Sequence, residues 1–468
     1  MRNLKTIFES IKAFLHLGYT LLFFFNNPEK LHNEGIRLKN YFERIGGIFI
    51  KFGQMLALRV DILPEGICRE LRNLLDNVTP FEYAQAEKMF EEEFNRTISK
   101  VFQKFEKKTI ASASLGQVYR AKLKTGELVA VKIRRPKIEE LAKSDIKLIT
   151  KISKIIDTIP LMPFKLTPVV KEFSSWVFEE LDYKNELNNL EEFSKFKSEI
   201  LPFFNVPLKI NLPKVYPQYS GKNILTMEFI EGVSVNKLIE LKNSKDQTEF
   251  RKLLKEGYNI KQILKNINLM QLKQIYIDGY FNADPHPANI IIKSNNQVYY
   301  VDFGLVGKLT DRQKAAVSKF LRSSSILDWR SAFQAAIIMF EVNDERKINQ
   351  LREEIKKMFN YLKKQRITYN TYSKASTDSI LYFSKLIYIL KLPIPIDISK
   401  ALRCVMTSDS IVHNLAPEAS VEEITQDLFK VTLAATFLGL KKKMNKDSIL
   451  KLAIKAINFV ESEILLED

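Results

Sequence analysis

The sequence of 468 residues has only two cysteines, Cys68 and Cys404. Two cysteines are too few for a disulfide framework, and their scarcity fits a reducing compartment. The sequence also lacks any run of about 20 apolar residues, the length that spans a bilayer. Zinc-finger spacings, RNA-binding aromatic signatures and basic helices with heptads are missing too. We therefore expect an intracellular protein with no transmembrane segment and no nucleic acid partner.

The apolar segment 13–25 comes closest to a membrane span, but it is short and contains His16. No small-residue cleavage site follows it, so we do not expect a signal peptide. Because Lys5 and Lys12 precede it, the segment could lie in a membrane interface. It could equally pack on the protein, and the sequence leaves both alternatives open.

What the sequence has in excess is positive charge. The net charge is +17 at pH 7, while 46% of the residues are hydrophobic and regularly spaced. This charge favours an anionic partner, such as lipid or nucleotide phosphates, although lysine-rich composition could also be a genomic bias. A chain of this length exceeds what one core usually holds, so we expect two or three subdomains.

A predicted hairpin lies in the most informative stretch, residues 281–304. Two short apolar runs, 290–292 and 298–301, flank the polar tetrapeptide 294–297, which is typical of a β-hairpin with a four-residue loop. This loop length pairs Lys293 with Val298.

In that register Asn289 falls directly opposite Asp302, with Cβ atoms about 5 Å apart. An amide oxygen and a carboxylate are hard ligands of the kind that Mg²⁺ takes. Asp284 precedes Asn289 by five residues, the spacing of the aspartate and asparagine in a kinase catalytic loop, and residues 302–304 form a DFG element. A polar loop beside a buried hairpin is the plainer alternative.

Residues 111–118 have the register of the nucleotide loop G-x-G-x-x-G-x-V, with alanine in place of the first two glycines. Lys132 follows in Leu-Val-Ala-Val-Lys-Ile, which matches the V-A-I-K lysine that holds nucleotide phosphates. The alternative is an edge-strand lysine that faces water. The loop residues expected to contact nucleotide are Ala111, Ser112, Ala113 and Ser114.

A predicted helix from 172 to 196 carries a cluster of acids. Asp182 and Glu186 share one helix face and repel each other unless cations neutralise them. Lys132 is the natural partner of Glu186, as in the lysine–glutamate pair of kinases. Glu180 lies about 160° round an ideal helix from Asp182, so helix geometry alone does not unite the acids. A solvated acidic face is the alternative.

A strand pair is expected over 215–222 and 223–229, and it leads to a hinge at 230–232 that would face the adenine. Glu228 and Ile230 are the hinge residues expected to contact the nucleotide. No A-P-E signature follows the DFG element, and its absence removes the usual peptide-substrate platform.

Lys51 and Gln54 lie three residues apart in an otherwise apolar predicted helix, so they share one face. A lysine in such a run usually extends its ammonium group to a surface. Here it could instead point its charge into a site.

Together these motifs resemble the UbiB (AarF-domain, or ADCK) family of atypical protein-kinase-like proteins, from about residue 35 to 310. The residues that carry the resemblance are Lys51–Gln54 (K-x-G-Q), the loop 111–114, Lys132, Glu180–Asp182 (E-x-D) with Glu186, the segment 283–289 and the DFG element 302–304. Two departures, Asn282 and Ala288, do not affect a proposed metal ligand.

The resemblance implies a protein that binds ATP with Mg²⁺ and supports ubiquinone-type isoprenoid-quinone biosynthesis or membrane lipid homeostasis. It implies that the K-x-G-Q helices cover the peptide entry and that Lys51 reaches the E-x-D acids. It further implies a peripheral position on an anionic, cytoplasmic membrane face, with a lipid or quinone precursor and quinone-biosynthesis proteins as partners. Many bacterial relatives end in transmembrane helices, which this sequence does not show. Asp284 and Lys132 are the expected catalytic residues, Asn289 and Asp302 the metal ligands, and Lys51, Gln54, Glu180 and Asp182 the regulatory residues.

We therefore expect an α+β, two-lobed protein-kinase-like fold and an ATP-dependent atypical kinase or ATPase. The expected domains are a helical extension at 1–108, an N-lobe at 109–233, a C-lobe at 234–335 and a helical region at 336–468. One alternative is a small-molecule phosphotransferase, which shares the Asp-x4-Asn loop. Another is a non-catalytic lipid-binding or chaperone module gated by nucleotide.

Overall fold

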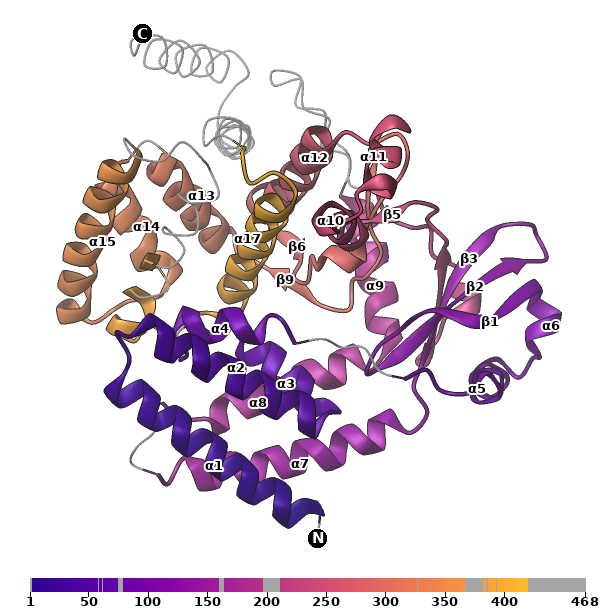
Figure 1. The fold of residues 1–468 in the computed structure, drawn as a ribbon, viewed down its shortest axis with the longest axis horizontal. Helices are drawn as coiled ribbons and strands as arrows, with labels where there is room; N and C mark the ends of the chain where they lie inside the picture. Colours follow the sequence, from indigo (N-terminus) through magenta and orange to yellow (C-terminus); the bar gives the residue numbers. More distant parts are fainter. Residues whose placement is uncertain are drawn as a thin grey trace.

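The structure is a computed structural model that describes residues 2–419, apart from 58, 61, 75–78, 160–163, 197–210, 326, 367–381, 384–385 and 393. It has the predicted α+β, two-lobed arrangement, with a small sheet-containing lobe beside a larger, mainly helical lobe (Figure 1). Additional helices from both ends of the chain pack beneath and beside the two lobes.

The N-lobe is built on a four-stranded antiparallel sheet in the order β1-β2-β3-β4. Alternate side chains such as Tyr119 and Val131 point to one face and are fully buried, as the two-residue period of a strand requires. Helix α5 packs on that face through Ala86 and Phe90. The elements are α5 (Tyr83–Phe94), α6 (Ile98–Val101), β1 (Phe102–Ser112), β2 (Gly116–Leu123), β3 (Leu128–Arg134) and β4 (Ile224–Glu228).

Strand β1 begins at Phe102, seven residues earlier than the predicted start of the N-lobe strands. Phe102 and Phe105 pack inward, with the Phe105 ring centroid 5.2 Å from that of Tyr119, while Lys104, Lys107 and Lys108 are exposed. A charged outer row is typical of an edge strand, which it protects from pairing with other chains. Because these charged residues interrupt the alternation of apolar and polar residues, the first part of β1 could not be predicted from the sequence.

The predicted strand pair before the hinge exists only in part. Val215 makes an isolated bridge to Met227, and Pro217–Tyr219 then forms a 3₁₀ turn, η1. Proline has no N–H to continue a ladder, so this pairing ends at Tyr216, while the other edge of β4 pairs with β3.

The C-lobe surrounds two short sheets, one of which contains the predicted hairpin. In one of them β6 pairs with β9, and in the other β5 and β8 flank β7. Residues 234–280, predicted to be helical, contain three helices and a π-helical turn before β6. The elements are β5 (Val233–Ser234), α10 (Val235–Asn243), α11 (Thr248–Lys255), α12 (Ile260–Leu272), η2 (Lys273–Asp278), β6 (Tyr280–Asn282), η3 (Pro287–Asn289), β7 (Ile290–Ile292), β8 (Val298–Tyr300) and β9 (Val306–Lys308).

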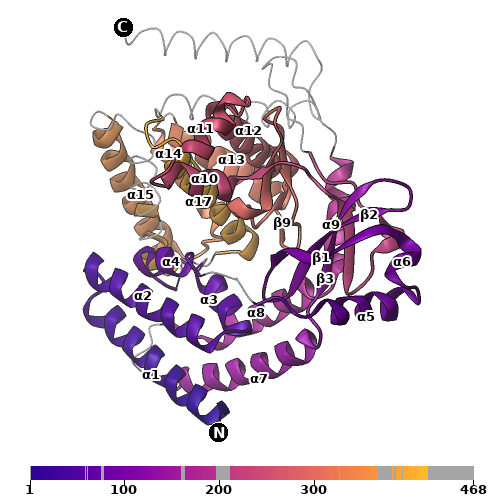
Figure 2. The ribbon, with the colours of Figure 1, turned by 45° about the vertical axis from the view of Figure 1, so that its right-hand side comes forward.

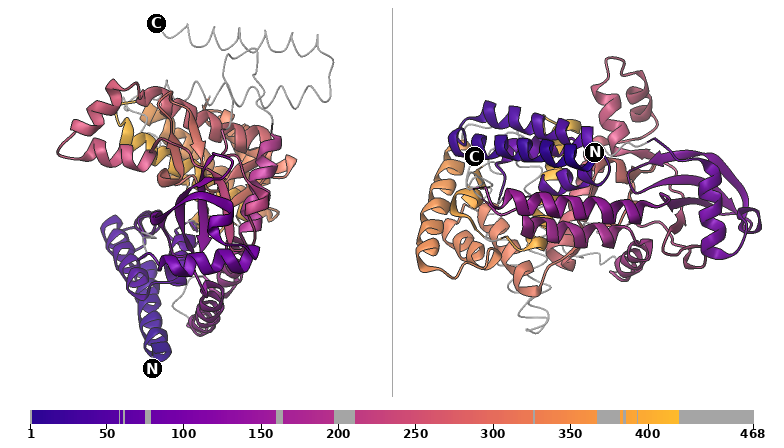
Figure 3. Two further views of the ribbon diagram at one scale, coloured as in Figure 1. Left: turned by 90° about the vertical axis from the view of Figure 1, so that its right-hand side faces the viewer. Right: turned by 90° about the horizontal axis from the view of Figure 1, so that it is seen from below.

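A layer of helices lies beneath the C-lobe and extends to the near edge of the N-lobe (Figures 1 and 2). Viewed from below, α1 and α7 lie side by side (Figure 3). The layer shares one hydrophobic core, in which the Phe52 ring of α3 lies 5.0 Å from the Phe173 ring of α8. Its members are α1 (Arg2–Phe23), α2 (Pro28–Ile45), α3 (Ile48–Leu56), α4 (Glu65–Leu71), α7 (Ile138–Ile156) and α8 (Thr167–Glu180).

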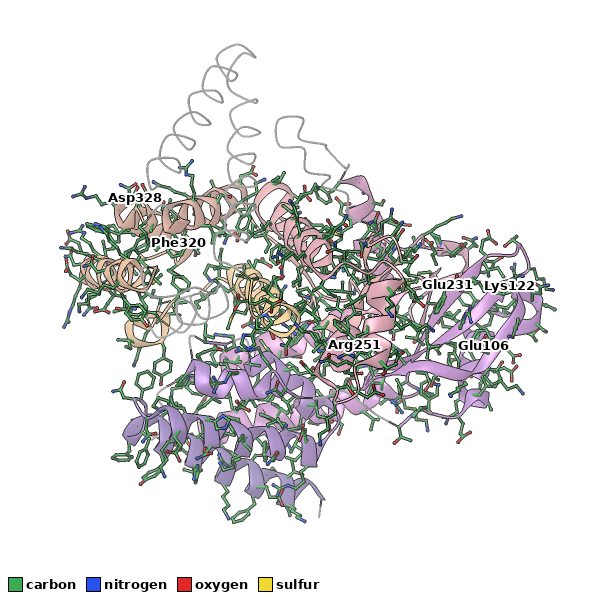
Figure 4. The ribbon with its side chains drawn as sticks, turned by 45° about the horizontal axis from the view of Figure 1, so that its top comes forward. Glu106, Lys122, Glu231, Arg251, Phe320 and Asp328 are labelled. Carbon is green, nitrogen blue, oxygen red and sulfur yellow. The ribbon has the colours of Figure 1, made fainter. Side chains whose placement is uncertain are left out.

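The remaining helices are α9 (Tyr183–Lys195) between the lobes, α13 (Asp311–Ser325), α14 (Trp329–Met339), α15 (Glu345–Arg366) and α17 (Ile396–Leu415). Phe320 on α13 and Asp328 before α14 lie at the opposite end of the molecule from Glu106 and Lys122 of the N-lobe (Figure 4). The predicted helical region 336–468 lies partly outside the described residues. Within them, no helix combines the length and hydropathy needed to cross a membrane.

Candidate active site

The central feature of the site is an ion pair between the N-lobe sheet and α9. Lys132 lies on β3, which has a partner strand on each side. Its Nζ donates to Glu186 Oε1 at 2.5 Å and to Asp302 Oδ2 at 3.1 Å. The Lys132 side chain is only 12% exposed, so the alternative of an edge-strand lysine facing water is wrong. The structure brings three of the predicted residues into direct contact.

The two carboxylates beside Lys132 differ in their affinity for protons. Burial raises the pKa of Glu186, and although Lys132 opposes this, the repulsion from Asp302 helps to bring the value to about 7. Burial would also raise the pKa of Asp302, but the attraction of Lys132, the hydrogen bonds from Gly304 N and Lys132, and the charge of Lys51 together lower that pKa. Burial alone would lower the pKa of Lys132, whereas Asp302 and Glu186 together raise it. The ammonium therefore stays charged, and Glu186 can exchange a proton near neutral pH.

Helix α9 holds the DFG element through residues spaced along one of its faces. Glu186 Oε1 accepts from Phe303 N at 3.1 Å, and Asn189 Nδ2 donates to Phe303 O at 2.8 Å. One turn further on, the Phe193 ring lies 4.6 Å from the fully buried Phe303 ring. These positions recur at helical spacing, so any shift of α9 would move the DFG element with it. The sequence analysis did not identify Asn189.

The hairpin exists, but its predicted register is wrong by one residue. Ile292, not Lys293, pairs with Val298. Asn296 adopts a left-handed conformation with φ 61°, and its N donates to Lys293 O at 2.9 Å. A turn followed by a left-handed residue gives a three-residue loop, and asparagine tolerates this conformation better than most residues.

The corrected register changes the relation of the two proposed metal ligands. Asn289 O accepts from Val301 N at 3.0 Å, so Asn289 is opposite Val301 and Asp302 lies one residue beyond. The direct opposition of Asn289 and Asp302 is therefore wrong, but both remain at the open end of the hairpin.

The segment before the hairpin places Asp284 beside the DFG element. Asn282 Oδ1 accepts from Asp284 N at 2.8 Å, while Asn282 Nδ2 donates to Asp302 O at 2.6 Å. Asn282 is almost fully buried, and it ties the two motifs together. Arg403 Nη2 donates to Asp284 Oδ1 at 2.7 Å from helix α17. The sequence analysis identified neither link, because Arg403 lies 119 residues from Asp284 and belongs to no motif.

The helix predicted from 172 to 196 is broken between α8 and α9. Asp182 is the N-cap of α9, and its Oδ1 accepts from Lys184 N at 3.0 Å, a contact that aspartate makes readily at this position. Arg134 Nη1 donates to Leu181 O at 2.6 Å and fixes the junction against β3. Asp182 therefore lies outside the helical turns, and the expected helix face shared with Glu186 does not form.

The break directs Glu180 towards the K-x-G-Q helix. Lys51 Nζ donates to Glu180 Oε1 at 2.7 Å, and both side chains are largely buried. Glu180 also lies beside the DFG glycine, since a Cβ on Gly304 would be 3.6 Å from Glu180 Cγ. The alternative of Lys51 as a surface lysine is wrong, because the residue pairs with the E-x-D motif. Its regulatory role stays a prediction.

Two other features position α3. Gly46 and Gly47, with φ of 74° and 60°, turn the chain sharply between α2 and α3, a conformation that glycine adopts at little cost. Gln54 Nε2 donates to Leu74 O at 3.3 Å. Gln54 thus holds the end of the N-terminal helices in place, and no contact between its side chain and the Lys132 cluster is seen in the described part of the chain.

The predicted nucleotide loop is the β1–β2 turn. Ala111 and Ser112 end β1, Ala113 N donates to Gly116 O at 2.8 Å, and Ser114 is buried. Neither alanine has a positive φ, so the loop needs no glycine at these two positions.

The predicted hinge residues lie at the end of β4 and just beyond it. Glu228 Oε2 accepts from Lys214 N at 3.2 Å, and Ile230 is buried. Nucleotide contacts by the loop and the hinge stay predictions.

The oxygen ligands offered by Asn289 and Asp302 fit Mg²⁺ better than a metal ion whose ligands all come from the protein. Asp302 supplies a carboxylate that is 38% exposed, and Asn289 supplies an amide oxygen at the same end of the hairpin. Within the described residues, no group of three or more His, Cys, Asp or Glu side chains could hold a metal ion. Mg²⁺ typically takes one or two protein carboxylates and completes its shell with water and substrate phosphates.

Comparison with known proteins agrees with this geometry. Residues 73–336, more than half of the chain, match the model of the ABC1 atypical kinase-like domain. A probable protein kinase UbiB of Pseudomonas aeruginosa is 33% identical over 347 residues, which cover 73% of this chain and 62% of the relative. An uncharacterized protein from the hydrogenase 1 5′ region of Clostridium pasteurianum is 30% identical over 397 residues, covering 83% of this chain and 69% of the relative.

Among solved structures, the complex of Rv3197 with erythromycin from Mycobacterium tuberculosis has a similar fold. The TM-score is 0.50 with 18% sequence identity, and the match covers 80% of this chain and 90% of the other. This likeness concerns the fold alone, and it agrees with the predicted kinase-like architecture.

The raised pKa of Glu186 predicts a pH-dependent difference between wild type and Glu186→Gln. Between about pH 4.5 and 7 the folded state holds a proton that the unfolded chain releases, so rising pH removes stability from the wild type. Glutamine does not titrate. The unfolding free energy of the variant, relative to wild type, should therefore increase by up to about 3 kcal/mol from pH 5 to 8, at about 1.4 kcal/mol per pKa unit.

The measurement is thermal unfolding of both proteins across this pH range, with Glu231→Gln as a control because Glu231 is well exposed. A difference between Glu186→Gln and wild type that stays constant with pH would contradict the raised pKa.

Proposed function

The chain belongs to the ABC1 atypical kinase-like family, and we propose that it is an ATP- and Mg²⁺-dependent atypical kinase or ATPase. We propose further that it acts on, or responds to, a lipid such as a quinone precursor at a membrane surface, in support of ubiquinone-type quinone biosynthesis or membrane lipid homeostasis. The relatives named UbiB support the quinone link. The chain spans only 62% of the length of that relative.

One observation carries the nucleotide part of the proposal: Lys132 is shared between Glu186 on α9 and Asp302 of the DFG element. This is the arrangement by which kinases place an ammonium group against nucleotide phosphates. Asn289 and Asp302 would hold Mg²⁺, which when bound neutralises negative charge on the phosphates. The lowered pKa of Asp302 keeps its carboxylate ionised at neutral pH, as a ligand of a divalent cation must be.

Asp284 would orient the nucleophile, which is a hydroxyl group of the acceptor or a water molecule. The attacking oxygen forms a bond to the γ-phosphorus, while the bond from that phosphorus to the β,γ-bridging oxygen breaks and ADP leaves. The proton of the attacking oxygen passes to the Asp284 carboxylate or to solvent. The acceptor is the part of the reaction that an assay must identify.

A non-catalytic, nucleotide-gated lipid-binding module is a second candidate function. It would use the same Lys132, Glu186 and Asp302 contacts, because ligands of a metal or of phosphates serve nucleotide binding as well as turnover. An ATPase assay on purified protein, with and without anionic vesicles and phenolic quinone precursors, separates the two functions. Turnover stimulated by lipid supports the first, and nucleotide binding without turnover supports the second.

Helix α1 supports the membrane part of the proposal. One of its faces packs on the protein through Phe14, Leu17 and Leu21, which are buried. The opposite face exposes large apolar side chains at helical spacing, so packing on the protein leaves a second apolar face in solvent. An exposed apolar stripe beside basic residues is typical of helices that lie in a membrane interface. The exposed apolar residues are Leu4, Phe8, Leu15, Tyr19, Leu22 and Phe23, with exposed Lys5 and Lys12 among them.

The metal assignment predicts that Asp302→Asn weakens Mg²⁺-dependent nucleotide binding without unfolding the protein, because the change removes a charge but keeps the shape of the side chain. We expect at least about a tenfold loss of affinity, or roughly 1.4 kcal/mol, in titrations with Mg²⁺-ATP. Nucleotide affinity measured in EDTA should change much less. Unchanged Mg²⁺-ATP affinity in a folded variant would exclude Asp302 as a ligand.

The exposed face of α1 predicts binding to anionic vesicles that salt weakens, since the Debye length shortens to about 8 Å at physiological ionic strength. In flotation assays, Phe8→Asp/Leu22→Asp should lose most of this binding. Leu254→Asp is the matched control, because Leu254 is an exposed apolar residue on α11. Equal flotation of the three proteins, or equal binding to neutral vesicles at high salt, would show that α1 and the net charge are not the attachment site.

A further inference from the structure

Helix α17 lies beyond residues 73–336, the range matched by the family model, yet it contacts the catalytic segments directly. Lys400 Nζ donates to Val306 O at 2.9 Å, just after the DFG element, and Cys404 Sγ donates to Asn282 O at 3.0 Å. Between them, Arg403 Nη2 donates to Asp284 Oδ1 at 2.7 Å. Figure 1 shows α17 beside β6 and β9, the strands that flank these segments.

We propose that Arg403 is a positioning residue for Asp284, and that the catalytic unit therefore includes the C-terminal helix α17. This inference rests on the proposed function. Arg403 holds Oδ1 of the carboxylate, and in the described part of the chain Oδ2 makes no hydrogen bond. Oδ2 is therefore the oxygen that faces the nucleophile and accepts its hydrogen bond.

The hydrogen bond between Arg403 and Asp284 is partly buried. The Arg403 side chain is 16% exposed, whereas that of Asp284 is 36% exposed, so the guanidinium approaches from the protein side and leaves the carboxylate accessible from the solvent side. A hydrogen bond between charged groups is stronger than a neutral one and restricts the carboxylate to one orientation. Asn282 fixes the backbone of the same residue through Asp284 N. Asp284 is thus held at both its main chain and its side chain.

A purely structural role for Arg403 is less consistent with its surroundings. Its Nη1 is buried and has no hydrogen-bond partner among the described residues, and a buried donor without a partner costs stability. An apolar side chain of similar length would attach α17 to the C-lobe without that cost. We therefore attribute the arginine at this position to its contact with the Asp284 carboxylate, and not to the packing of α17 on the C-lobe.

In the transfer step, the attacking oxygen bonds to the γ-phosphorus, the bond to the β,γ-bridging oxygen breaks, ADP leaves, and the proton moves to Asp284 Oδ2 or to water. Arg403 takes part only by holding Asp284 in place. Without it, the carboxylate can turn away from the nucleophile, and small displacements of reacting groups are costly. Loss of Arg403 should therefore lower kcat and leave nucleotide binding almost unchanged.

The experiment compares steady-state Mg²⁺-ATP turnover by the full chain as wild type, Arg403→Gln, Arg403→Lys and Arg251→Gln. We expect Arg403→Gln to lower kcat about 10- to 100-fold, while KM and the Kd for ATP stay within about threefold, and Arg403→Lys to recover part of the loss. Arg251→Gln, the same substitution at an exposed arginine on α11, is the control and should keep kcat within about twofold.

A second measurement uses the Asp284→Asn background, where Arg403→Gln should have little further effect, because residues that act through each other are not additive. Carbodiimide labelling of the Asp284 carboxylate, read by mass spectrometry, should increase in Arg403→Gln and stay unchanged in Arg251→Gln. Wild-type turnover that Arg403→Gln does not alter would overturn this inference and leave the proposed function standing. No turnover by the wild type under any lipid condition would overturn the catalytic function and this inference with it.

Discussion

The structure depends on one ammonium group, that of Lys132, shared between two carboxylates. Glu186 belongs to a helix between the lobes, and Asp302 belongs to the DFG element, so the interaction joins three segments that are distant in sequence. Removal of one partner from a buried ion pair leaves an uncompensated charge and typically costs about 3–5 kcal/mol. The Lys132 contacts therefore fix the orientation of α9 and the position of the DFG element relative to the N-lobe sheet.

Both ends of the described chain extend this charge network. Lys51 of the N-terminal helices neutralises Glu180 beside Gly304, and Arg403 of helix α17 holds Asp284. The kinase-like motifs lie between these two helices in the sequence, but the site is completed by charges from outside them. We expect the flanking helices to restrict what can reach the nucleotide, as the family resemblance implies. That restriction would distinguish the protein from kinases that present an open platform to peptides.

The two-lobed fold and the Lys132–Glu186 pair could be predicted because the local patterns around Lys132, in the acidic helix and from Asp284 to the DFG element match those of kinases, in which the strand lysine pairs with a helix glutamate. The hairpin register could not be predicted, because the left-handed conformation of Asn296 does not change the spacing of the hydrophobic residues. The helix break at Asp182 could not be predicted either, because an aspartate that caps a helix cannot be told from an acidic residue within one by sequence alone. Arg403 was beyond prediction, since its contact with Asp284 is created by tertiary packing alone.

Centrally, we propose that the contact of Lys51 with Glu180 holds the K-x-G-Q helix over the acceptor side of the site, as the family resemblance implies. Incorporation of labelled ATP into wild type and Lys51→Ala, with Lys51→Ala/Asp302→Asn as the inactive control, tests it most directly. Loss of the Lys51–Glu180 contact should loosen the cover. We predict that the wild type phosphorylates no generic peptide and that Lys51→Ala acquires autophosphorylation that the control lacks. Robust peptide phosphorylation by the wild type would contradict the account.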